Sequence, residues 1–131
     1  MALPSSLPRG SWRNVLLVIE DRALSEVLSE ALVEAGHAAT QVEDAVAARS
    51  ALALERFDAA IVDLDTRARQ GVSLIARLRA EHPGITVIAL LPCGGLPARS
   101  GPPAYHLAIE KPARLSAILS AVNVAHAALR N

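Results

Sequence analysis

Three apolar runs of this sequence are followed closely by charged residues that could act together on a phosphoryl group. Glu20-Asp21 follow residues 15–19, Asp63 follows residues 59–62, and Lys111-Pro112 follow residues 107–109. If these runs are parallel strands of one sheet, their charged neighbours lie at its carboxyl edge, where open α/β sheets bind ligands. Three carboxylates and one ammonium group at this edge suggest a divalent cation and a phosphoryl group.

The hydrophobic pattern predicts strands and helices in alternation, which could bring these residues together. Continuous apolar runs are typical of strands buried on both faces, and apolar residues three and four apart are typical of helices. Strands are predicted at residues 15–19, 39–43, 59–63, 85–91 and 105–109. Helices are predicted at residues 22–35, at 45–55, from Gly71 or Ser73 to Pro83, and at 112–129. This alternation predicts an α/β domain with one parallel sheet and right-handed crossovers.

Local signals mark the ends of several helices. Asp21 and Asp44 are predicted N-caps, because a carboxylate can accept hydrogen bonds from the first free N–H groups of a helix. Gly36 is a natural stop for the first helix. Residues 92–104 stand where a further helix is expected, but they are dense in proline and glycine, which disfavour helix interiors. The fourth helix of the alternation is therefore predicted to be short or missing.

Size and composition narrow the class of protein. The chain has 131 residues, enough for one domain, predicted at residues 14–131 after a flexible N-terminal arm at 1–13. Its formal net charge is zero, which argues against direct binding of nucleic acid. Cys93 is the only cysteine, so no internal disulfide can form. No apolar stretch approaches the roughly 20 residues that span a bilayer, so no membrane insertion is expected. The single cysteine makes a reducing compartment the default, and the expected location is cytoplasmic.

The order and spacing of these motifs resemble the receiver domain of two-component response regulators, over about residues 14–125. VLLVIED resembles the first strand of that family with its acidic pair, and FDAAIVDLD resembles its phosphoacceptor strand. Gly71 and the IEKP sequence around Lys111 also match the family pattern. The resemblance implies a flavodoxin-like (β/α)5 fold, with a doubly wound, five-stranded parallel sheet.

The resemblance also implies a role for each charged residue. Asp63 would be the phosphoacceptor. Asp21 and Asp63 would ligate Mg²⁺, with Glu20 reaching it directly or through water and the backbone carbonyl of Asp65 completing the protein ligands. Lys111 would pair with Asp63 and then with the phosphoryl group. The domain would accept a phosphoryl group from a histidine kinase or phosphotransfer protein and signal to an output protein or effector domain. It would be an autocatalytic phosphoacceptor at most, and not an enzyme.

Three positions depart from the family pattern. Leu91 stands where the family usually has Ser or Thr, and Pro92 has no N–H to offer the phosphoryl group. Ala108 stands at the position of the aromatic switch residue. These departures support a second hypothesis, a degenerate receiver that acts as an interaction module without phosphorylation.

Other interpretations are weaker. Asp63-Leu64-Asp65 resembles the Asp-x-Asp motif of haloacid-dehalogenase-type phosphatases, which place it near an N-terminal strand and need further acids downstream. A B12-binding module would have histidine at the position of Asp65. An exposed part of the last predicted helix could serve a homodimer or partner contact. The sequence leaves open whether the chain is a stand-alone receiver or a fragment of a longer regulator.

Overall fold

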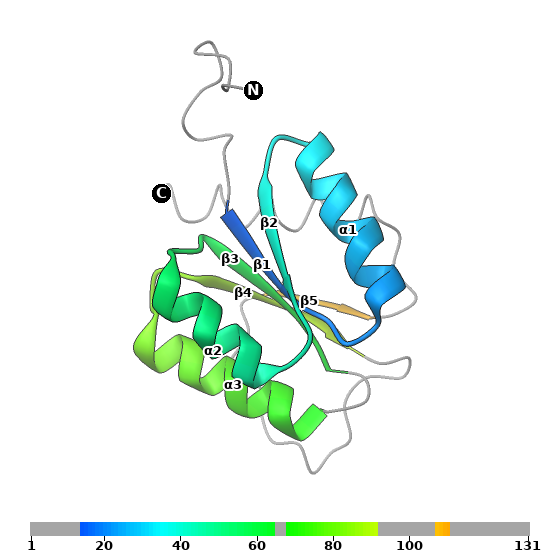
Figure 1. The fold of residues 1–131 in the computed structure, drawn as a ribbon. Helices are drawn as coiled ribbons and strands as arrows, with labels where there is room; N and C mark the ends of the chain where they lie inside the picture. Colours follow the sequence, from blue (N-terminus) through cyan, green and yellow to red (C-terminus); the bar gives the residue numbers. More distant parts are fainter. Residues whose placement is uncertain (1–13, 65–67, 92–106, 111–131) are drawn as a thin grey trace.

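The structure is a computed structural model that describes residues 14–64, 68–91 and 107–110. Strands and helices alternate along most of this part of the chain (Figure 1). The strands are β1 (Asn14–Val18), β2 (Ala38–Val42), β3 (Ala59–Asp63), β4 (Thr86–Leu91) and β5 (Leu107–Glu110). The helices are α1 (Arg22–Glu34), α2 (Ala45–Leu54) and α3 (Ala68–Glu81).

The strands form one parallel sheet in the order β2-β1-β3-β4-β5. The chain moves from β1 outward to β2, then returns past β1 to β3 and continues to β4 and β5. β1 and β3 are therefore neighbours although a helix, a strand and a second helix separate them in sequence. The order reverses direction at this pair, which makes the β1–β3 boundary the topological switch point of the sheet.

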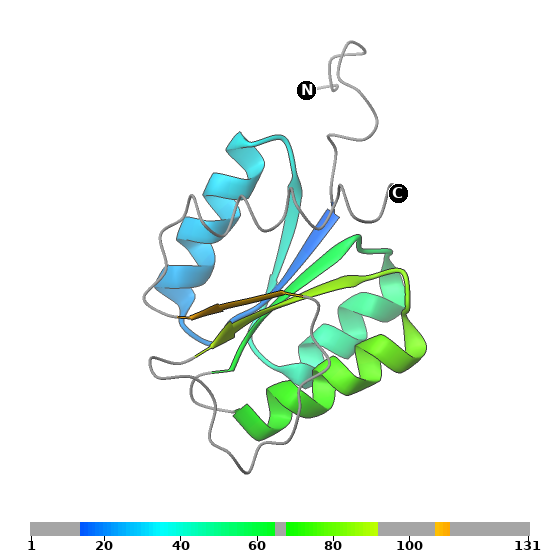
Figure 2. The same ribbon diagram turned by 180° about the vertical axis from the view of Figure 1, so that it is seen from behind.

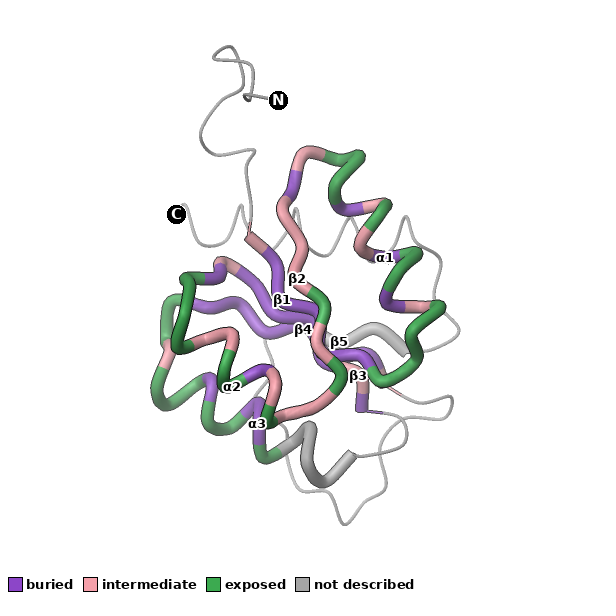
Figure 3. The backbone as a smooth tube through the Cα atoms, in the orientation of Figure 1, coloured by how far each residue is buried: buried purple, intermediate pink, exposed green. Residues whose placement is uncertain are grey.

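Helices cover both faces of the sheet. α1 lies on one face, and α2 and α3 lie side by side on the other (Figures 1 and 2). Because successive strand residues point to opposite faces, β1 supplies both cores: Val15 and Leu17 pack on the α1 side, and Leu16 and Val18 pack on the α2–α3 side. Figure 3 shows that buried residues concentrate in the strands and on the inner sides of the helices.

The ends of the first two helices follow the local sequence signals. Asp21 accepts a hydrogen bond from the backbone N–H of Leu24 at 3.2 Å, and Asp44 accepts one from Ala47 at 2.8 Å. Gly36 follows α1 with φ of +97°, a conformation that side chains with a Cβ rarely adopt. Both predicted N-caps and the predicted stop after α1 are confirmed.

The prediction of an α/β domain with a parallel sheet and helices on both faces is confirmed. The predicted start of the third helix at Gly71 or Ser73 is wrong, because α3 begins at Ala68. Alanine, arginine and glutamine at 68–70 are good helix formers, and their propensity outweighs the cost of one interior glycine. Among the described residues, no helix has the length and apolar character needed to cross a membrane.

Several predictions fall on residues outside the described ranges. They are the N-terminal arm at 1–13, the carbonyl of Asp65, Pro92 with the predicted loop at 92–104, Lys111, and the last helix at 112–129.

Candidate functional site

The predicted acidic residues lie at the carboxyl edge of the sheet, on the two strands that form its switch point. Glu20 and Asp21 follow β1, and Asp63 is the last residue of β3. β1 and β3 are paired in register up to Val18 and Val62, so both strands end at the same level. The fold therefore brings together, at one edge, acids that are more than 40 positions apart in sequence.

Asp63 is held in place by its neighbours in β3. Val62 and Leu64 on either side are buried, and the N–H of Leu64 donates to the carbonyl of Leu90 at 2.9 Å. Asp63 itself is half-buried and pairs in register with Leu90 of β4. A carboxylate on such a rigid strand end is well positioned to react with a group that approaches the edge of the sheet.

Glu20 and Asp21 are exposed at the start of the loop that connects β1 to α1. The preceding residue, Ile19, is buried, and its N–H donates to the carbonyl of Val42 in β2 at 3.1 Å. Asp21 uses its Oδ1 atom to cap α1. Its second carboxylate oxygen is not part of that cap, so capping and metal binding are compatible in one side chain.

The ends of β4 and β5 complete this edge. Leu91 ends β4, is half-buried, packs against the core on the α2–α3 side, and pairs in register with Glu110 of β5. The side chain of Leu91 therefore offers no hydroxyl group at this strand end. Ala108 lies within β5, in register with Ala89. Lys111 follows Glu110 directly in sequence, and its structural position lies outside the described ranges.

The donor atoms at this edge fit Mg²⁺ in type, although they do not form a complete site. Glu20, Asp21 and Asp63 offer the carboxylate oxygens that Mg²⁺ prefers. Within residues 14–64, 68–91 and 107–110, however, no group of three or more acidic, histidine or cysteine residues is arranged to hold a metal ion. Mg²⁺ commonly takes only one or two carboxylates and keeps several waters, so two of these acids are sufficient in number.

One ion pair at the same edge was not predicted. Arg22 at the start of α1 lies 3.3 Å from Glu43, which follows β2. Next to this pair is a hollow of about 250 Å³, whose lining includes Ile19, Ser25 and Gln41. The position of Glu43 at this edge could have been predicted from the sequence, because Glu43 ends the predicted second strand just as Asp63 ends the third. Both side chains of the ion pair are exposed, so its contribution to stability is small.

Comparison with known proteins adds sequence evidence. The chain is 37% identical over 82 residues to the response regulator protein FleR of Pseudomonas aeruginosa. This match covers 63% of the chain but only 17% of FleR, so the chain spans about a sixth of this relative. No family model matches the chain.

Solved structures agree with the fold. The CheY-like receiver domain of a response regulator from Methylobacillus flagellatus matches with a TM-score of 0.74 and 22% identity, over 88% of this chain and 99% of that domain. The receiver domain of a signal transduction histidine kinase from Syntrophus aciditrophicus matches with a TM-score of 0.78 and 23% identity, over 88% and 91%. The chain has the fold of a receiver domain. In this receiver-like domain, the acidic edge described above is the candidate site.

Proposed function

We propose that this receiver-like domain accepts a phosphoryl group on Asp63 in a phosphorelay, as part of signal transduction. The observation that carries the proposal is the position of Asp63 at the end of β3, beside the acidic pair that follows β1. The similarity to FleR supports the signalling class. The phosphoryl donor would be a histidine kinase or a phosphotransfer protein, and the recipient of the signal an output protein or effector domain.

The reaction is a phosphoryl transfer between side chains. A carboxylate oxygen of Asp63 attacks the phosphorus of a phosphohistidine, the P–N bond breaks, and the imidazole leaves with the bonding electrons. The products are an acyl phosphate on Asp63 and a neutral histidine, whose imidazole takes up one proton as it leaves. Mg²⁺, when bound, neutralises charge on the transferring oxygens.

The residues of the chain position the reactants. Asp63 is fixed by its buried neighbours, so its carboxylate needs little reorganisation before attack. Asp21 and Glu20 supply oxygen ligands at the adjacent strand end, and Asp65 would add a carbonyl. Lys111 would bring an ammonium group to the phosphoryl oxygens from the segment that follows β5.

The proposal is tested with acetyl phosphate as donor. We expect the wild-type protein to gain one phosphoryl group that alkali and hydroxylamine remove, in the presence of Mg²⁺, located on Asp63 by mass spectrometry of peptides. Asp63→Asn keeps the size of the side chain but removes the nucleophile, and it should gain none. Equal labelling of the two proteins would contradict the assignment of Asp63.

One observation favours a second candidate function, a receiver fold that binds a partner without phosphorylation. Leu91 packs its apolar side chain against the core at the strand end where a hydroxyl would contact the phosphoryl group. A missing hydrogen bond to a charged group costs about 1.5–3 kcal/mol, which would shorten the lifetime or lower the yield of the acyl phosphate. Absence of any Mg²⁺-dependent labelling in the wild type would favour this second function.

A further inference from the structure

In the part of the chain that the structure describes, the helices on the two faces of the sheet differ in charge, although the formal net charge of the chain is zero. α1, on one face, contains three glutamates and one arginine. α2 and α3, on the other face, together contain four arginines and one glutamate. This separation is not required for folding, because charged residues that produce it are exposed; they include Glu26, Glu30, Glu34, Arg49 and Arg77.

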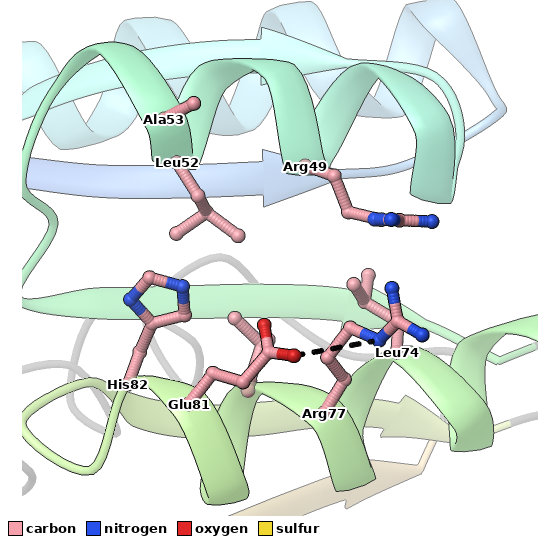
Figure 4. Close-up of a pocket in the computed structure, with 8 residues that line it drawn as sticks. Arg49, Leu52, Ala53, Leu74, Arg77, Glu81 and His82 are labelled. Carbon is pink, nitrogen blue, oxygen red and sulfur yellow. Dashed lines mark ion pairs between the residues drawn. The ribbon is translucent and has the colours of Figure 1, made fainter.

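The basic face contains a groove between α2 and α3. It has a volume of about 210 Å³, and apolar side chains line part of it. Figure 4 shows Arg49 reaching from α2 and Arg77 from α3 into the same part of the groove. The lining residues are Arg49, Leu52, Ala53, Leu74, Arg77, Leu78, Glu81 and His82.

The two arginines are available for an acidic partner. Among the described residues, Arg49 makes no ion pair. Arg77 lies 3.9 Å from Glu81 on its own helix, and both side chains are about half exposed. An exposed pair at this distance contributes little, so Arg77 can exchange it for a carboxylate from another molecule at small cost.

The exposed side of α1 is complementary to this groove. Glu26, Glu30 and Glu34 follow one another at intervals of four residues, which places them on one stripe of the helix. The stripe also carries Val27 and Val33, which are 46% and 57% exposed. The carboxylates of this stripe can pair with the two arginines of the groove, and the valines between them can contact the apolar side chains that line it.

We propose that the groove between α2 and α3 binds the α1 stripe of a second copy of this chain. α1 lies on one face of the sheet, and α2 and α3, whose residues line the groove, lie on the other (Figures 1 and 2). The contact is therefore head-to-tail and leaves one free groove and one free stripe. Such a contact adds further copies instead of closing as a two-fold dimer. This inference does not rest on the proposed phosphorylation of Asp63.

Sedimentation of the full chain at increasing concentration tests the proposal. We expect reversible association that continues beyond dimers and weakens as the ionic strength rises from about 0.01 M to 0.15 M, since screening then shortens from about 30 Å to about 8 Å. The double variant Arg49→Glu with Arg77→Glu should associate at least about tenfold more weakly. Arg56→Glu, an exposed charge reversal in the loop before β3, is the matched control and should behave like the wild type.

A mixing experiment separates the specific contact from a general effect of charge. The variant Glu26→Arg with Glu30→Arg should also associate weakly by itself, but it should recover association when mixed with the double arginine variant, whose groove is now acidic. Circular dichroism establishes that each variant is folded. A wild-type protein that stays monomeric at low salt, or mixed variants that do not associate, would overturn the proposal. Asp63→Asn lacks the proposed phosphoacceptor and should associate like the wild type. Its behaviour therefore separates self-association from phosphorylation of Asp63.

Discussion

At the scale of single residues, Asp21 combines a structural role with a candidate chemical role. It caps α1 through Oδ1. It also lies at the carboxyl edge of the sheet, where β3 ends with Asp63. Asparagine caps a helix about as well as aspartate but lacks the negative charge that Mg²⁺ needs. Substitutions at this one position can therefore separate the two roles.

We expect Asp21→Ala to lower the free energy of unfolding by about 1 kcal/mol, because the cap is lost, and Asp21→Asn to change it much less. Both variants should weaken Mg²⁺-dependent binding of beryllofluoride. Urea unfolding and a binding titration measure the two effects.

Asp44→Ala is the matched control, because it removes the equivalent cap of α2. It should cost a similar free energy of unfolding and leave beryllofluoride binding unchanged. A loss of binding in Asp44→Ala equal to that in Asp21→Ala would show that helix stability, and not the carboxylate at Asp21, controls binding.

Leu91 offers a second test at this scale, because the site lacks a hydroxyl there. Leu91→Thr should bind beryllofluoride about tenfold more tightly, since a hydrogen bond to a charged group contributes about 1.5–3 kcal/mol. Valine has nearly the shape of threonine but no hydroxyl, so Leu91→Val should not gain affinity for beryllofluoride. Equal affinities for the two variants would contradict a phosphoryl contact at the end of β4.

At the scale of elements, the helix ends depend on residues with local effects. Gly36 has φ of +97° just after α1, and a Cβ there would meet no atom within 4 Å. Its substitution therefore tests backbone conformation alone. Gly84, before β4, also has open space around its Cα, but it does not have a positive φ.

We expect Gly36→Ala to lower the free energy of unfolding by about 1 kcal/mol or more, because alanine is strained at positive φ. Gly84→Ala should be neutral or slightly stabilising, since it restricts only the unfolded chain. Thermal unfolding of the two variants provides the comparison. A loss in Gly84→Ala as large as that in Gly36→Ala would contradict this explanation.

Those features that depend on neighbouring residues could be predicted from the sequence. Asp21, Asp44 and Gly36 carry their capping signals within one helical turn, and the apolar runs of β1 and β3 mark buried strands by composition alone. The start of α3 could not be predicted in this way, because the local signals at Gly71 and Ser73 suggested a later start, whereas the helix begins at Ala68 and continues through both residues.

At the scale of the whole molecule, the sheet is the rigid base on which the site depends. β1 and β3 lie in the middle of the sheet, and their side chains fill the cores on both faces. Leu17 is completely buried between the sheet and α1. Damage to this core should therefore affect the entire domain.

We expect Leu17→Ala to lower the free energy of unfolding by about 2–5 kcal/mol, through lost burial and the cavity left behind. Leu54→Ala, which removes the same atoms from a side chain 86% exposed at the end of α2, should cost less than about 0.5 kcal/mol. Urea unfolding followed by circular dichroism measures both. Similar losses in the two variants would mean that burial does not determine the contribution of leucine here.

The grouping of the acids could be predicted only through the fold. The sequence shows Glu20, Asp21 and Asp63 at the ends of apolar runs, and the parallel sheet places those ends at one edge. The ion pair of Arg22 with Glu43 and the groove between α2 and α3 depend on side-chain positions and helix packing. Periodicity specifies neither, because it identifies the inner face of each helix but not how two helices lie against each other.

Mg²⁺-dependent binding of beryllofluoride, followed by amide NMR shifts, tests the central claim most directly. The account predicts saturable binding by the wild-type protein, with shifts at the residues that follow β1 and at the end of β3, and no binding by Asp63→Asn. Shifts that extend from this edge into α1 or β4 would indicate that the rest of the domain responds to the phosphoryl group. No binding by the wild type at millimolar Mg²⁺ would contradict the claim that the acidic edge is a phosphoacceptor site.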